Sequence, residues 1–186
     1  QAADNREELT GMGTTVVAAV VVDDRRTARP GVAVAHVGDS RCYRLRDGAL
    51  DLVTRDHSLV NELVALGRLR QADAARHPMA NVVTRALGAD PTVDVDVVVI
   101  EPGACRLLLC SDGLSDELSA RTIGRVLAGV DDPQRAADRL VELTLAGVAR
   151  DNVTAVVVDV IDAVEVLGSG SLGRTADTIV EFFHGS

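Results

Sequence analysis

The sequence predicts an α+β fold with antiparallel β-sheets, because segments of strand pattern follow one another in adjacent runs and two helical segments come in succession near the end. Strands and helices do not alternate one for one, as they do in parallel βαβ folds. The 186 residues are 47% hydrophobic, which suits one globular domain with its own core. Only 2% are aromatic, so the core has to be built from aliphatic side chains.

The predicted strands are short and rich in valine. The segment "GVAVAHVGDSRCYRLRDGALDLVT" (31–54) predicts a hairpin, because Asp47-Gly48 is a strong two-residue turn signal. The run "CRLLLC" (105–110) has the apolar pattern of a buried strand. Further strands are predicted within residues 11–24, 93–103 and 152–162.

Three helices are predicted, at residues 56–69, 115–129 and 131–147. Apolar residues recur at helical spacing in the first, and Asp56 or Ser58 would cap its start. Ser115 or Asp116 would cap the second. The third is capped by Asp132, which a proline follows in the first helical position.

The charge of the chain narrows the classes of function. The net charge is −9, and such a surface repels nucleic acid and anionic membranes, so we expect no nucleic-acid partner. All 19 basic residues are arginine. The absence of lysine excludes a P-loop lysine, a kinase strand lysine and a Schiff base.

The cysteines Cys42, Cys105 and Cys110 form no CxxC pair, and Cys110 lies in an apolar run where we expect it to fill the core. An odd number without a disulfide framework favours a reducing compartment. No signal peptide is visible, and no apolar run reaches the roughly 18 residues that span a membrane. We therefore expect a cytoplasmic protein without a membrane-spanning segment.

Three aspartates stand at the ends of predicted buried strands. Asp39 follows "VAVAHVG", Asp112 follows "LLLCS", and Asp151 precedes "NVTAVVV". Strand ends of one sheet lie near one another, and converging carboxylates must take up protons or a cation. Oxygen ligands without histidine or cysteine spacing favour Mg²⁺ or Mn²⁺ over Zn²⁺. Each aspartate alone has the simpler reading of a turn or cap residue, so the hypothesis depends on the three together.

Six motifs occur in the order "GMGTT", "HVGDSRCY", "TRDHSLVNELVALGRL", "HPMANVVTRALG", "LLLCSDGLSDEL" and "RDNVTAVVV". Together they resemble the bacterial branch of the metal-dependent protein serine/threonine phosphatases, the PPM or type 2C family. The match covers about residues 10–162. The resemblance implies a two-layer antiparallel β-sandwich flanked by α-helices. It also implies hydrolysis of phosphoserine and phosphothreonine on proteins, with a cognate Ser/Thr kinase as a further partner.

The resemblance also implies a centre of two Mn²⁺ or Mg²⁺ ions at one end of the sandwich, where the ions activate water and neutralise charge on the phosphate. By motif, Asp112 and Asp151 resemble the family's metal ligands, and Asp39 resembles the carboxylate of a third, weaker site. Residues 56–85, which we call the flap segment, resemble the mobile flap beside the active site. Gly113 is expected to let the backbone turn close to the metal.

The sequence departs from the family at its start, because neither the early acidic/Arg motif nor an Asp-Gly-x-Gly-Gly motif is present. We expect a phosphatase-like domain over residues 1–162 that lacks the N-terminal strands, and a linker and tail over residues 163–186. The missing bridging aspartate leaves open a second function, a catalytically inactive module that binds a phosphoprotein, a kinase or a regulator. A nucleotide enzyme is disfavoured, since no glycine-rich phosphate loop opens a helix.

Other polar residues receive simpler interpretations. His36 is expected to be a satisfied sheet histidine, Arg41 a surface side chain, and Arg55-Asp56 a solvated pair. His57 and His77, in the flap segment, do not have the spacing of metal ligands. Ser40 and Ser111 lack the His and Asp partners of a nucleophilic triad.

Overall fold

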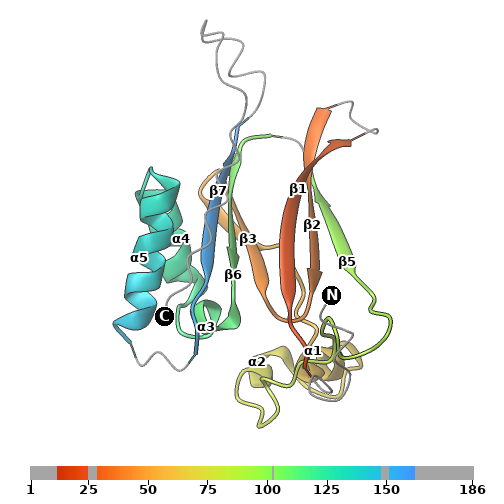
Figure 1. Ribbon diagram of the computed structural model, residues 1–186. Coiled ribbons are helices and arrows are strands. Elements are labelled where there is room, and N and C mark those ends of the chain that lie inside the picture. The colour runs from red at the N-terminus through yellow and green to blue at the C-terminus, as the bar shows by residue number, and fades with distance from the viewer. Residues whose placement is uncertain (1–11, 25–28, 102, 148–150, 162–186) are drawn as a thin grey trace, which may run out of the picture.

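The computed structural model describes residues 12–24, 29–101, 103–147 and 151–161. Two antiparallel sheets lie face to face in it (Figure 1). The first sheet has three strands in the order β1-β2-β5, and their bounds are Val16–Asp24, Arg29–Val37 and Asp96–Ile100. The second has four in the order β4-β3-β6-β7, with bounds Ala49–Leu52, Arg41–Arg46, Cys105–Cys110 and Ala155–Val160. The predicted α+β class and the sandwich are confirmed.

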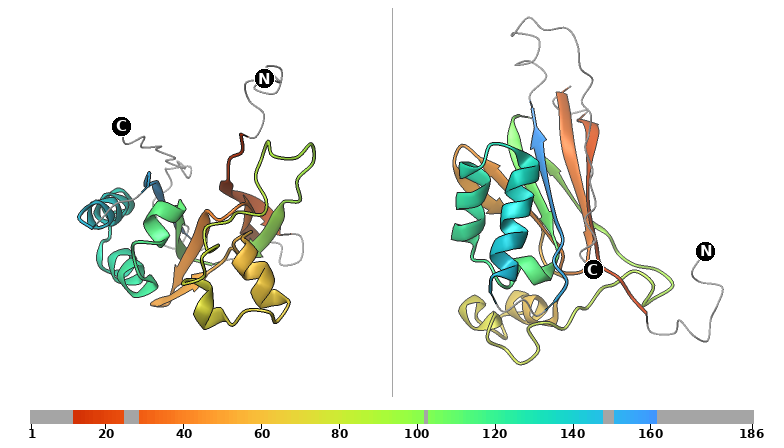
Figure 2. Two further views of the ribbon diagram at one scale, coloured as in Figure 1. Left: turned by 90° about the horizontal axis from the view of Figure 1, so that it is seen from below. Right: turned by 60° about the vertical axis from the view of Figure 1, so that its left-hand side comes forward.

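The helices fall into two groups. Helices α4 (Ala120–Gly129) and α5 (Pro133–Leu145) pack on the outer face of the four-stranded sheet (Figure 2). Helices α1 (Leu59–Ala65), α2 (Gln71–Ala74) and α3 (Asp112–Ser115) lie at one end of the sandwich (Figure 1). None of the described helices has the length and apolar character that crossing a membrane requires.

Two apolar layers hold the fold together. One lies between the sheets, where Val34 of β2 and Leu107 of β6 are buried. The other lies between the four-stranded sheet and the helices, where Leu108 packs with Leu140 of α5. Each fully buried leucine contributes about 1.5–3 kcal/mol. Alternate residues of β6 thus face the two layers, which is why its sequence is apolar throughout.

The predicted hairpin at residues 31–54 is half right. Asp47 and Gly48 form its turn with positive φ angles of 51° and 77°, and β3 pairs with β4 on either side. The apolar first part, however, is β2 in the other sheet. The chain leaves that sheet at Gly38, whose φ of 104° breaks the strand and whose Cβ would lie 2.3 Å from Thr15 Cγ2. Asp39 lies in this crossover.

The predicted helix starts also need one correction. Ser58 accepts a bond from the Asn61 amide, and Asp132 accepts one from the Arg135 amide, so these two caps are confirmed. Neither Ser115 nor Asp116 caps α4, because the short helix α3 ends at Ser115 and the Ser119 side chain accepts the bond from the Thr122 amide. The predicted linker and tail at 163–186 lie outside the described residues.

Candidate metal centre

Asp112 and Asp151 are carried by neighbouring chain segments just beyond the paired strands β6 and β7. The last pair of the ladder is Cys110 with Ala155. The pairing continues through Ser111, whose amide donates to the Thr154 carbonyl at 3.1 Å and whose Oγ accepts from the Thr154 amide at 3.0 Å. The two aspartates are therefore delivered to the same end of the four-stranded sheet.

Gly113 explains how the two segments come so close. A Cβ on this residue would lie 2.4 Å from the Asn152 carbonyl oxygen and 3.5 Å from Asp151 Cβ. Gly113 is not among the positive-φ residues, so its role here is not a left-handed backbone conformation. It is needed because only a residue without a side chain leaves room for Asp151-Asn152.

Asp39 lies within the electrostatic reach of Asp112. Burial raises the pKa of Asp39 above its usual value, and the Asp112 carboxylate raises it further. Burial also raises the pKa of Asp116, an effect that Arg41 opposes and Asp112 reinforces. Carboxylates gathered in this way favour a proton or a cation among them.

Arg41 is already committed to another partner. Its Nε and Nη2 donate to the Asp56 carboxylate at 3.0 and 2.6 Å, and this carboxylate is only 11% exposed. Burial lowers the pKa of Arg41, but the bonds and charge of Asp56 outweigh this and keep it above its usual value. The predicted solvated pair of Arg55 with Asp56 is wrong, since Arg55 donates instead to the Asn61 carbonyl at 3.2 Å.

A second group of donors lies where the flap segment meets the first sheet. In the part of the chain that the structure describes, it is the one group of three His, Cys, Asp or Glu side chains with donor atoms within 4.8 Å of one another: His36, His57 and Asp96. The three predicted aspartates do not form such a group. The imidazole rings of His36 and His57 stack at 4.6 Å. The His36 Nδ1 atom is buried without a hydrogen-bond partner, so the expectation of a satisfied histidine is wrong.

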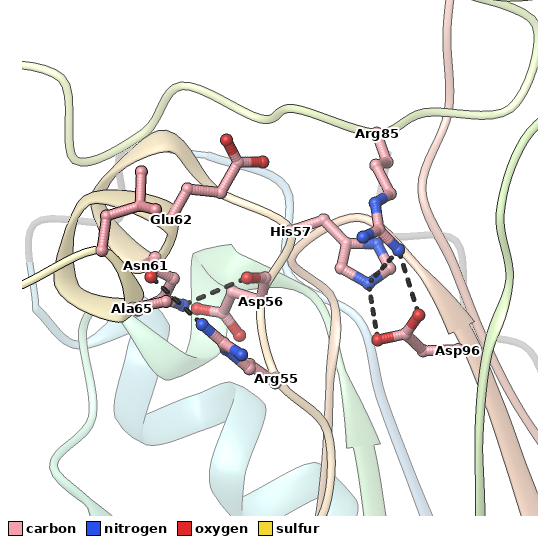
Figure 3. Close-up of a pocket in the computed structure, with 9 residues that line it drawn as sticks. Arg55, Asp56, His57, Asn61, Glu62, Ala65, Arg85 and Asp96 are labelled. Atoms are coloured by element: carbon pink, nitrogen blue, oxygen red, sulfur yellow. Dashed lines mark hydrogen bonds and ion pairs between the residues drawn. The ribbon is translucent and has the colours of Figure 1, made fainter.

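A cavity of about 340 Å³ opens beside this second group (Figure 3). Its wall is formed by helix α1 on one side and by His57, Arg85 and Asp96 on the other. Asp96 accepts from Arg85 at 3.0 Å and lies 3.2 Å from His57 Nε2. The hydrogen bond from His57 lowers the pKa of Asp96; weak burial opposes this, and the Arg85 bond adds to it.

The family model described as protein phosphatase 2C matches residues 1–148. This chain belongs to the protein phosphatase 2C family. It is 40% identical over 155 residues to the serine/threonine protein phosphatase PstP of Mycobacterium tuberculosis, covering 83% of this chain and 29% of that protein. It is 37% identical over 158 residues to the serine/threonine phosphatase stp of Listeria monocytogenes, covering 84% and 60%.

Solved structures of the family share the fold. A bacterial serine phosphatase superposes with a TM-score of 0.76 at 34% identity, covering 87% of this chain and 63% of that one. The catalytic domain of PstP, solved in complex with two manganese ions, gives 0.70 at 36% identity, covering 87% and 64%. The chain thus spans less than two thirds of the length of these relatives.

The remaining polar residues singled out from the sequence contact residues next to them in the fold. His77 Nδ1 accepts from the Met79 amide at 3.2 Å, and Ser40 Oγ lies 2.9 Å from Thr15 Oγ1. Sequence reasoning missed the group around His57 because its members come from β2, the flap segment and β5. The signal that could have found it is the register of the first sheet, which sets His36 opposite Asp96.

Proposed function

We propose that this chain carries part of the metal centre of a protein phosphatase that hydrolyses phosphoserine and phosphothreonine with Mn²⁺ or Mg²⁺. The observation that carries the proposal is the close approach of the segments bearing Asp112 and Asp151, with Asp39 in the field of Asp112. The relative solved with two manganese ions supports it.

The donor chemistry fits divalent cations. Asp112 and Asp151 offer carboxylate oxygens, which suit Mn²⁺ and Mg²⁺. Arg41 donates to the Asp56 carboxylate, so its guanidinium is already paired with another carboxylate. When bound, such ions supply an activated water and neutralise charge that develops on the phosphate.

The chain's own residues hold the carboxylates in place. Asp112 Oδ1 accepts from the Gly113 amide at 2.8 Å, and Asp151 Oδ1 accepts from the Asn152 amide at 2.7 Å. Each carboxylate therefore has one oxygen oriented by its own backbone. Bound cations would also reverse the local field, so that a chain of net charge −9 accepts a phosphorylated protein.

The test is release of phosphate from a phosphothreonine peptide in the presence of Mn²⁺. We expect Asp112→Asn to lower the rate at least about 100-fold, equivalent to about 3 kcal/mol of lost transition-state stabilisation. Asp94→Asn, which removes an exposed carboxylate ahead of β5, is the matched control and should leave the rate unchanged. Equal background rates in all three proteins would count against the proposal and favour the binding module.

A cognate Ser/Thr kinase and a cytoplasmic location belong to the same proposal. Support for the kinase is indirect: a phosphatase acts on sites that a kinase has phosphorylated. Support for the location comes from the three cysteines, which are all free thiols. Co-purification of a kinase from the source cell, and fractionation of that cell, would test these two points.

A further inference from the structure

Two consecutive residues of the flap segment, Asp56 and His57, form hydrogen bonds with the loop that carries Asp39. Asp56 binds Arg41 through Nε and Nη2, on one side of Asp39-Ser40. His57 binds Gly38 on the other side, and does so twice. Its amide donates to the Gly38 carbonyl at 2.9 Å, and the Gly38 amide donates to His57 Nδ1 at 3.1 Å. The crossover between the sheets is thus held at both ends.

The contacts of His57 with Gly38 and Asp96 favour one position of its ring proton. Because Nδ1 accepts from the Gly38 amide, the neutral ring carries its proton on Nε2. Nε2 lies 3.2 Å from Asp96 Oδ2, which accepts that proton. Asp96 is itself oriented by Arg85, whose Nη1 donates to Oδ1 at 3.0 Å. The His57 side chain is 5% exposed, and its Nε2 atom faces the Asp96 carboxylate and Arg85 Nη1, which lies 3.4 Å away (Figure 3).

The same tautomer argues against a metal ion at His36, His57 and Asp96. A cation on Nε2 would move the ring proton of neutral His57 to Nδ1, where it would face the Gly38 N–H, so that two donors would oppose each other. Arg85 already supplies positive charge to the Asp96 carboxylate. The group is therefore better explained as a hydrogen-bonded support than as a set of metal ligands.

We propose that His57 is a positioning residue for Asp39: its imidazole, held between the Gly38 amide and the Asp96 carboxylate, sets the place of the Asp39 loop at the metal centre. This inference rests on the proposed function, because the position of Asp39 affects activity only if Asp39 takes part in metal binding. It also gives the flap segment a role, since the residues that begin it are the ones that hold the loop.

A matched pair of substitutions separates positioning from simple stability. His57→Asn keeps an acceptor at the place of Nδ1 and loses the contact with Asp96. His57→Gln reaches Asp96 with its amide and loses the acceptor for Gly38. Supporting contacts of this kind change metal affinity by about 10–100-fold. We expect His57→Gln to weaken Mn²⁺ binding in calorimetry at least about 10-fold and His57→Asn to stay within about 3-fold of the unchanged chain.

Equal losses in the two variants, or a larger loss in His57→Asn, would overturn the proposal. Substrate kinetics give a second readout. His57→Gln should shift the Mn²⁺ concentration at half-maximal rate and leave the KM for the peptide unchanged. A shift in KM alone would also overturn it.

Nitrogen-15 NMR of the metal-free chain tests the geometry independently of phosphatase activity. We expect a proton on Nε2 of His57, and a Gly38 amide resonance that moves in His57→Gln and much less in His57→Asn. If these hold while the unchanged chain binds no Mn²⁺, the proposed function fails and the support of the loop stands. A proton on Nδ1, or Zn²⁺ binding that His36→Ala abolishes, would overturn the positioning role itself.

Discussion

Gly113 lies so close to Asn152 that a Cβ on the glycine would sit 2.4 Å from the Asn152 carbonyl oxygen. This contact joins the end of β6 to the start of the segment leading into β7. It sets the distance between Asp112 and Asp151, since each aspartate directly precedes one member of the pair. A methyl group at residue 113 would push the two segments apart.

Gly113→Ala should therefore lower the free energy of unfolding by at least about 2 kcal/mol and weaken Mn²⁺ binding. Gly129→Ala is the matched control, because a Cβ there meets nothing within 4 Å at the end of α4. It should be neutral or stabilise by up to about 1 kcal/mol. Urea unfolding with and without Mn²⁺ measures both, and equal effects in the two variants would refute the close contact.

The ion pair of Arg41 with Asp56 should matter more than a surface pair. Asp56→Asn is expected to cost about 2 kcal/mol of stability, because hydrogen bonds to charged groups contribute about 1.5–3 kcal/mol. Glu142→Gln breaks the exposed pair with Arg139 on α5 and should cost less than about 0.5 kcal/mol. Chemical denaturation compares the free energies of unfolding of the two variants. Similar losses would show that the half-buried pair stabilises the fold no more than the exposed pair.

Ionisation of Asp39 should destabilise the metal-free chain as pH rises, because burial and Asp112 raise the pKa of this carboxyl. Between the usual and the raised pKa the folded chain holds more protons than the unfolded one, so stability falls across this window and the loss is complete above it. Asp39→Asn removes the ionisable group and therefore this pH-dependent loss of stability. We expect its Tm to rise at pH 7, by about 2–4 °C for each kcal/mol gained, and not at pH 3.

The exposed substitution Asp94→Asn gives the baseline for these melting curves. An equal rise in Tm for Asp39→Asn at both pH values would mean that the effect does not come from ionisation. Excess Mn²⁺ should raise the Tm of the unchanged chain by more than it raises the Tm of the Asp39→Asn variant, because a cation offsets the repulsion that the substitution has already removed.

The three thiols should differ in reactivity. Burial raises the pKa of Cys42 and of Cys110 to about 12, whereas Cys105 is only partly buried. Since the thiolate is the reacting form, a thiol reagent at pH 8 should modify Cys105 first and the other two only after unfolding. Mass spectrometry of the modified peptides identifies them. Fast labelling of Cys42 in the folded chain would contradict its place between the sheets.

Local sequence patterns were enough to predict the strands, the turn at Asp47-Gly48 and the helix cap at Asp132, because each of these depends on a few adjacent residues. They were also enough to place Asp112 and Asp151 at paired strand ends. They failed where distant segments decide the outcome. Nothing near Gly38 in the sequence says that Thr15 crowds it or that the chain changes sheets there.

The support around His57 shows the same limit. His36 faces Asp96 only through the register of β2 with β5, and His57 reaches both from the flap segment. Sequence spacing could not relate these residues. The Arg41 pair with Asp56 was missed for a similar reason, since adjacency in sequence favoured Arg55 as the partner of Asp56.

The most direct test of the central claim is an anomalous diffraction map of crystals grown with Mn²⁺. The account predicts a manganese peak at about 2.0–2.6 Å from carboxylate oxygens of both Asp112 and Asp151. That peak should be lost in Asp112→Asn and kept in Asp94→Asn. A map with no peak between these two aspartates, or with its only peak at His36, His57 and Asp96, would contradict the account.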